Sequence, residues 1–132
     1  MSHREPGDTQ YLYPSNSGEG VVAYVIDSGI YLEHEEFEGR VKEGLTLVPD
    51  EGHSHGTGHG THVAGTIGSR KYGVAKKAKI VAVKVMGGGK HSTGSSGDFI
   101  AGIEWATEDA SRLRMQAIEE FKATGRDRKS VV

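Results

Sequence analysis

The sequence predicts an α/β fold built on a parallel sheet, and three features carry this prediction. Two apolar runs rich in β-branched residues, at 21–26 and 79–86, are apolar on both faces, as parallel strands covered by helices are. Each run ends in a turn that contains glycine, at 27–29 and at 87–89. A long amphipathic helix is expected over 98–124. Strands separated by helical segments are typical of this fold class.

The elements are expected in the following order. Residues 1–19 form an irregular arm, since Pro14, Asn16 and Gly18 are turn formers. Residues 20–132 form one domain, which begins with the strand at 21–26. A shorter strand is expected at 41–48, between the two strongly apolar strands.

The helix at 98–124 is expected to bury one apolar stripe. Asp98 stands where a cap belongs, and Gly125 stands where a helix-ending glycine belongs. At 1.5 Å per residue the helix would be about 40 Å long, so it either extends beyond the sheet or bends near Ser111. The stripe, at spacings of three and four, consists of Phe99, Ile103, Ala106, Ala110, Leu113, Ala117 and Phe121.

The composition excludes several classes of protein. The 16 Lys and Arg residues nearly balance 18 Asp and Glu, so there is no basic excess of the kind that nucleic acid or an anionic membrane would select. The absence of cysteine excludes disulfides, thiolate zinc sites and a cysteine nucleophile. The polar first twenty residues do not have the pattern of a signal peptide. The 20 glycines indicate turns and close approaches of the backbone.

Two residues are candidates for chemistry. Asp27 directly follows a buried strand, at the end of a parallel sheet where ligands bind. Its carboxylate either orients a partner or bonds the backbone of its own turn. His59 lies among glycines at the start of a segment of small residues. It is either a structural histidine or a catalytic one, which would need a carboxylate on Nδ1.

The histidines around His59 suggest a metal site as a further alternative. His53, His55 and His62 lie within six residues of it, and imidazole is a good ligand for zinc or copper. However, the glycines between them do not hold the ligands in a set geometry. We therefore predict no metal site, and a His-rich metal-binding domain stays an alternative function.

Two blocks of sequence resemble the subtilisin-like serine proteases of peptidase family S8. Tyr-Val-Ile-Asp-Ser-Gly-Ile at 24–30 is similar to the family's Asp block, and Gly-His-Gly-Thr-His-Val-Ala-Gly-Thr at 58–66 is similar to its His block. The stretch 68–78 resembles the proteinase K and cerevisin branch found in fungi. The similarity covers about 20–105, and 111–128 looks like an insertion. The resemblance implies a three-layer subtilisin-like fold with a mostly parallel sheet, of which this chain is a truncated N-terminal part.

The resemblance also implies roles for individual residues. Asp27 and His59 would be the acid and base of an Asp-His-Ser triad in a serine endopeptidase. Ser92, Thr93 and Gly94 would form the edge that binds an extended polypeptide substrate through its backbone. A flexible Gly/Ser loop is the alternative for these three residues.

The family's serine block, Gly-Thr-Ser-Met-Ala-Thr-Pro, does not occur in this sequence. The family's triad order places that block after the histidine. We therefore expect this chain to be the N-terminal portion of a longer protease. Alone it would be inactive, and prone to aggregate through its unpaired strand edge.

Partners and location follow from the resemblance alone. It implies an extracellular or vacuolar protein, an inhibitory propeptide as a partner, and structural calcium whose ligands are not assignable in this half. No other cofactor and no nucleic-acid or membrane partner is expected. His62 would pack within its helix. A catalytically inactive module that binds extended peptides is the second function considered.

Overall fold

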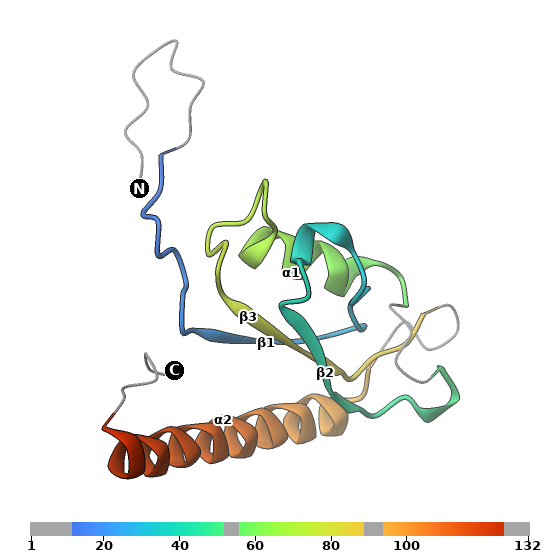
Figure 1. Cartoon of the computed structure of the whole chain (residues 1–132). Helices are drawn as coiled ribbons and strands as arrows, with labels where there is room; N and C mark the ends of the chain where they lie inside the picture. The colour runs from blue at the N-terminus through green and yellow to red at the C-terminus, as the bar shows by residue number, and fades with distance from the viewer. Residues whose placement is uncertain (1–11, 52–55, 89–93, 126–132) are drawn as a thin grey trace.

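The computed structural model describes residues 12–51, 56–88 and 94–125. A parallel sheet forms the middle layer, helix α1 (His59–Gly68) covers one face, and helix α2 (Ser96–Thr124) lies across the other (Figure 1). The predicted α/β class and the three layers are therefore confirmed. Most of the expected N-terminal arm, residues 1–11, lies outside the described residues.

The sheet has three strands in the order β1-β3-β2, all parallel. They are β1 (Val22–Asp27), β2 (Val41–Thr46) and β3 (Lys79–Lys84). Two short 3-10 helices, Glu35–Phe37 and Pro49–Glu51, flank β2 in the chain. Pairing of β2 with β3 shifts register between Glu43 and Thr46. Strand β2 ends two residues before the expected boundary at 48. The last pair of the β1–β3 register joins Asp27 to Lys84.

The α1 face of the sheet holds a closely packed core. Side chains of α1, such as the fully buried Ala64, pack on the strands. Small residues in this helix let its backbone lie close to the sheet. The buried members of this core are Val25, Ile30, Phe37, Val41, Ala64, Ile80 and Ala82.

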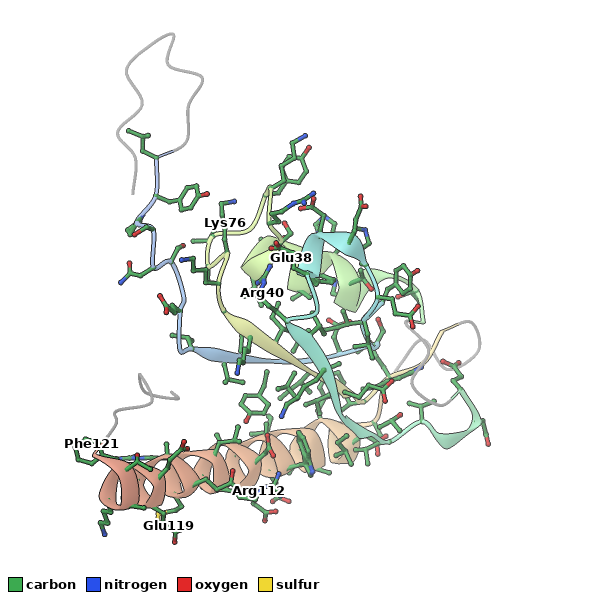
Figure 2. All side chains as sticks on the ribbon, in the orientation of Figure 1. Glu38, Arg40, Lys76, Arg112, Glu119 and Phe121 are labelled. Atoms are coloured by element: carbon green, nitrogen blue, oxygen red, sulfur yellow. The ribbon has the colours of Figure 1, made fainter. Side chains whose placement is uncertain are left out.

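Arg40 and Glu36 secure the amino end of the sheet, opposite to the ends of the strands that carry Asp27 and Lys84. Arg40 donates to the carbonyl oxygens of Gly68 and Ala78, at 2.7 and 3.0 Å, and so joins the end of α1 to the entry of β3 (Figure 2). Glu36 accepts a hydrogen bond from the Lys71 backbone N–H at 2.8 Å. That bond lowers the pKa of the Glu36 carboxyl.

Helix α2 corrects two details of the prediction, the cap and part of the buried stripe, and decides a third, since it protrudes and does not bend near Ser111. Its N-cap is Ser95, and Asp98 is the third residue of a capping box, in which each side chain bonds the other residue's backbone N–H. The helix runs unbroken for 29 residues and extends beyond the sheet (Figure 1). Two members of the expected buried stripe, Ile103 and Phe121, are 54% and 51% exposed.

The line of α2 that does contact the sheet runs along Phe99, Gly102, Ala106 and Asp109. Gly102, Ala106 and Asp109 are its buried residues. Phe99 and Trp105 pack against the strand core of Val81, Val83 and Val85. The spacing of three and four was therefore predicted correctly, and two members of the expected stripe, Phe99 and Ala106, lie on this line. Its other two positions are the neighbours of Ile103 and Ala110 in the sequence, Gly102 and Asp109.

Candidate active site

Asp27 and His59 meet at the carboxyl end of the sheet. Nδ1 of His59 lies 2.8 Å from Oδ2 and 2.9 Å from Oδ1 of Asp27. The Asp27 side chain is 13% exposed and the His59 side chain is 69% exposed. A half-enclosed carboxylate thus holds one ring nitrogen of a histidine that is otherwise open to solvent. This arrangement fixes the tautomer and orientation of an imidazole that is to act as a base.

Both readings of Asp27 considered from the sequence hold at once. Besides contacting His59, its Oδ1 accepts a hydrogen bond from the Ser28 backbone N–H at 2.6 Å. The turn therefore orients the carboxylate, and the carboxylate orients the imidazole. A local turn contact and a partner across the sheet edge do not compete here, because the carboxylate has several acceptor sites.

Ser28 joins the loop after β1 to the first turn of α1. It is fully buried, and its Oγ accepts a hydrogen bond from the Gly60 backbone N–H at 3.2 Å. A Cβ on Gly60 would overlap the carbonyl oxygen of Gly29. Because helix α1 begins at His59, this contact sets the position of the histidine relative to Asp27. Gly58 before it takes a φ of +82°, which favours glycine.

The predicted substrate edge is described only in part. Ser92 and Thr93 lie outside the described residues, whereas Gly94 precedes the cap of α2. A Cβ on Gly94 would lie 2.7 Å from the carbonyl oxygen of Val85, so the backbone there packs directly on the segment that leaves β3.

The histidine cluster is likewise only partly described. His53 and His55 lie outside the described residues. The side chain of His62 is exposed, which corrects the expectation that it packs. Within 12–51, 56–88 and 94–125, no group of three His, Asp or Glu side chains is placed to hold a metal ion.

Sequence reasoning missed two contributors at this end of the molecule. Ser28 was overlooked because a serine beside a candidate aspartate carries no distinct pattern. Lys84 did have a signal, since it is a lysine between Val83 and Val85 in an apolar strand. Its side chain is buried and pairs with Glu51 at 3.1 Å.

A carboxylate that holds a histidine at the carboxyl end of a parallel sheet is an arrangement that acid–base catalysis uses. The comparison with protein families identifies the group: residues 18–120 match the subtilase family, peptidase S8. The chain belongs to this family of serine proteases.

Two similar proteins are fungal proteases, in agreement with the branch that the sequence resembles. A subtilisin-like protease of Coccidioides posadasii is 49% identical over 127 residues, which are 95% of this chain and 33% of the relative. The subtilisin-like serine protease Rho m 2.0101 of Rhodotorula mucilaginosa is 52% identical over 112 residues, 82% of this chain and 32% of the relative.

A solved structure shares the fold. The crystal structure of a cold adapted subtilisin-like serine proteinase aligns with a TM-score of 0.66 and 42% identity, over 76% of this chain and 36% of that one. The chain thus spans about a third of the length of the relatives that it matches. None of the helices in the described part of the chain has the length and apolar character of a membrane-spanning segment.

Proposed function

We propose that Asp27 and His59 are the acid and base of a serine endopeptidase triad. The observation that carries this proposal is the contact of His59 Nδ1 with both Asp27 oxygens, at 2.8 and 2.9 Å. With Nδ1 held, Nε2 is the nitrogen left to take a proton from a serine hydroxyl as it attacks a peptide carbonyl. Asp27 stabilises the imidazolium that results, and His59 then returns the proton to the leaving amine.

The chain by itself supplies two of the three residues. No serine block of the family type occurs in its sequence. In subtilisin, a relative and not this protein, loss of the serine lowers kcat by about 10⁶. We therefore expect the 132-residue chain not to hydrolyse peptides. A fluorogenic peptide assay of the purified chain checks this, and turnover blocked by a serine-directed phosphonate would contradict it.

A chimera tests the roles of the two residues. Residues 18–120 of this chain would replace the matching segment of the Rhodotorula mucilaginosa relative, which brings its own remaining two thirds. The chimera should hydrolyse peptides. His59→Ala should lower kcat by about 10⁶ and Asp27→Asn by about 10⁴.

His62→Ala is the matched control for this chimera, because His62 is an exposed histidine of the same helix. We expect it to leave kcat within about twofold. A chimera that stays active after His59→Ala would overturn the proposed role. A chimera that binds peptides without cleaving them would favour the inactive peptide-binding module.

The proposal extends to the substrate, the propeptide and the location of the protein. Extended polypeptides are the substrates, bound through backbone hydrogen bonds along the segment of Ser92, Thr93 and Gly94. An inhibitory propeptide and an extracellular or vacuolar location are expected of a member of this family. Support for these statements is membership in the family alone.

A further inference from the structure

A second charged cluster lies at the same end of the sheet as the Asp27–His59 pair. Nζ of Lys84 donates to Oε2 of Glu51 at 3.1 Å. The backbone N–H of Gly88 is shared between both Glu51 oxygens, at 3.0 and 2.9 Å. We call these three residues the Glu51 clamp. It joins the 3-10 helix after β2 to the segment that leaves β3.

The clamp lies on the α1 side of the sheet, and its lysine is buried. Ile80 and Ala82 belong to the core beneath α1, so Lys84, two residues further along β3, points to the same face. The Lys84 side chain is 2% exposed and that of Glu51 is 23% exposed. A buried ammonium destabilises a fold unless it is paired, and breaking such a pair is strongly unfavourable. Glu51 is therefore held in place by the charge that it neutralises.

The clamp connects to His59 through two close backbone contacts. A Cβ on Gly88 would lie 3.3 Å from the carbonyl carbon of Gly56. A Cβ on Gly56 would in turn lie 2.8 Å from the carbonyl oxygen of Ser28. The segment that enters α1 is thus packed between the backbone held by Glu51 and the turn that holds Asp27. Only Thr57 and Gly58 separate Gly56 from His59.

We propose that Glu51 is a positioning residue for His59, and that it acts through Gly88 and Gly56. Glu51 holds the backbone of Gly88, and the segment entering α1 packs against Gly88 through Gly56. This packing keeps the imidazole of His59 within hydrogen-bond distance of the Asp27 carboxylate. The role rests on the proposed function, in which His59 is the general base. The role of Glu51 is to fix the position of His59 relative to Asp27, because small displacements of a catalytic group lower rates steeply.

Glutamate variants of the intact 132-residue chain test this directly. Glu51→Ala removes the clamp, and Glu51→Leu keeps the approximate size of the side chain while removing both its charge and the oxygens that accept from the Gly88 N–H. Long-range proton–nitrogen NMR at about pH 9, where an ordinary histidine is neutral, reports the tautomer of each ring. We expect the Nδ1–H tautomer of His59 to be the major one in the wild type. In both variants, the population of the Nε2–H tautomer should increase. Hydrogen-exchange protection of the Gly88 amide should fall by about tenfold or more.

Controls separate positioning from general loss of stability. Glu36→Gln removes a similar carboxylate at the amino end of the sheet, where Glu36 bonds Arg70 Nη2 at 3.2 Å and the Lys71 backbone N–H at 2.8 Å. Glu36→Gln should leave the His59 tautomer unchanged, even when it is compared with a Glu51 variant at a urea concentration that gives both the same free energy of unfolding. The exposed His62 is the internal reference, and its ring should not respond in any variant.

A double variant keeps the test decisive if the single variants fail to fold. Glu51→Leu with Lys84→Met leaves no unpaired charge in the core and no side-chain acceptor for the Gly88 N–H, so folding should recover while the His59 tautomer stays shifted. A wild-type tautomer at His59 in the folded Glu51 variants, single or double, overturns the inference. In the chimera, the corresponding variants should lower kcat by about tenfold with KM nearly unchanged. An active chimera that does not need His59 would instead overturn the proposed function, so the two failures are distinguishable.

Discussion

The two faces of the sheet are packed in different ways. On the α1 side, the first turn of the helix lies backbone to backbone on the loop after β1, where Gly60 meets the Gly29 carbonyl, and the helix carries His59 at its first position. On the α2 face, side chains mediate the contact, and Gly102 of the helix meets the methyl groups of Val85 and Ile26. The face that positions the candidate catalytic pair is thus the one that leaves the least freedom for displacement.

A buried polar contact distinguishes the α2 face further. Oδ2 of Asp109, a buried residue, accepts a hydrogen bond from the Tyr24 hydroxyl at 2.8 Å, and Asp109 also pairs with Arg112 (Figure 2). The Tyr24 ring meets Trp105 edge to face, with centroids 6.4 Å apart. Helix α2 is therefore oriented by a few specific contacts along the line that it presents to the sheet.

The largest expected effect comes from Gly60→Ala. The new methyl group would overlap the carbonyl oxygen of Gly29, and backbone cannot move aside without displacing α1 from β1. We expect the free energy of unfolding to fall by about 3 kcal/mol, at the upper end of overpacking effects. Urea-induced unfolding followed by circular dichroism measures the loss.

Gly65→Ala is the control for this change. Gly65 lies in the same helix, and a Cβ there meets nothing within 4 Å. It should stabilise the helix by about 0.5 to 1 kcal/mol, because alanine is the better helix former. Equal stability of the two alanine variants would contradict the view that α1 is held by backbone contact.

Gly102→Ala is expected to have a smaller effect on the opposite face. Its Cβ would lie 2.7 Å from Cγ1 of Val85 and 3.2 Å from Cγ2 of Ile26, and side chains can give way where backbone cannot. The gain in helix propensity offsets part of the strain, so we expect a net loss of about 1 kcal/mol. Fluorescence of Trp105, the single tryptophan, reports the docking of α2.

Gly97→Ala is the control for Gly102→Ala, because the nearest atom to a new Cβ at position 97 is the Ser95 hydroxyl oxygen, at 3.7 Å. That variant should not shift the emission of Trp105. If Gly102→Ala destabilises the chain as much as Gly60→Ala does, the distinction between the two faces is wrong.

Tyr24→Phe tests the polar contact and adds a dependence on pH. Removal of the hydroxyl should lower the free energy of unfolding by about 1 kcal/mol near neutral pH, since Asp109 keeps its pair with Arg112. Burial, together with the hydrogen bond to Asp109, raises the pKa of Tyr24 from 10.0 to about 12. The unfolded chain therefore loses the tyrosine proton first as the pH rises.

The stability that depends on this proton is complete below pH 10.0 and is lost as the pH rises through about 12. Urea midpoints measured across this range should fall more steeply for the wild type than for Tyr24→Phe, so the gap between them narrows. A constant gap would show that the hydroxyl is not protected by the α2 face.

The smallest effect is expected from the exposed apolar residues of α2. Ile103 and Ile118 are 54% and 37% exposed, and substitution of either by Gln should change the free energy of unfolding by less than about 0.5 kcal/mol. Calorimetric melting of each variant provides the measurement. A loss above about 1 kcal/mol would mean that these side chains pack more firmly than their exposure indicates.

Particular residues show how far prediction from the sequence reaches. The strands at 21–26 and 79–86 were recognisable because continuous runs of β-branched residues are typical of buried strands. The bounds of each strand were predicted to within two residues. The cap of α2 was misassigned because Ser95 and Asp98 are both good capping residues, and only the reciprocal bonds distinguish them. The buried stripe was displaced because small and polar residues, Gly102 and Asp109, make the contact in place of Ile103.

The candidate pair was predictable for a related reason. Asp27 and His59 stand in short, continuous blocks, at 24–30 and 58–66, and these blocks resemble those of the family closely. The residues that support them follow no such pattern. Glu51 lies in a loop, and nothing in its neighbours indicates that its carboxylate reaches Lys84 and Gly88.

The sequence by itself determined the fold class, the end of the sheet where chemistry would lie, and the two residues proposed to carry it. These depend on local periodicity and on motifs confined to a few adjacent positions. Only the tertiary structure decided which side of α2 is buried, how the segment entering α1 is held, and which carboxylate neutralises the buried Lys84. Such contacts join residues distant in the chain, and their energies depend on burial and geometry that no local pattern encodes.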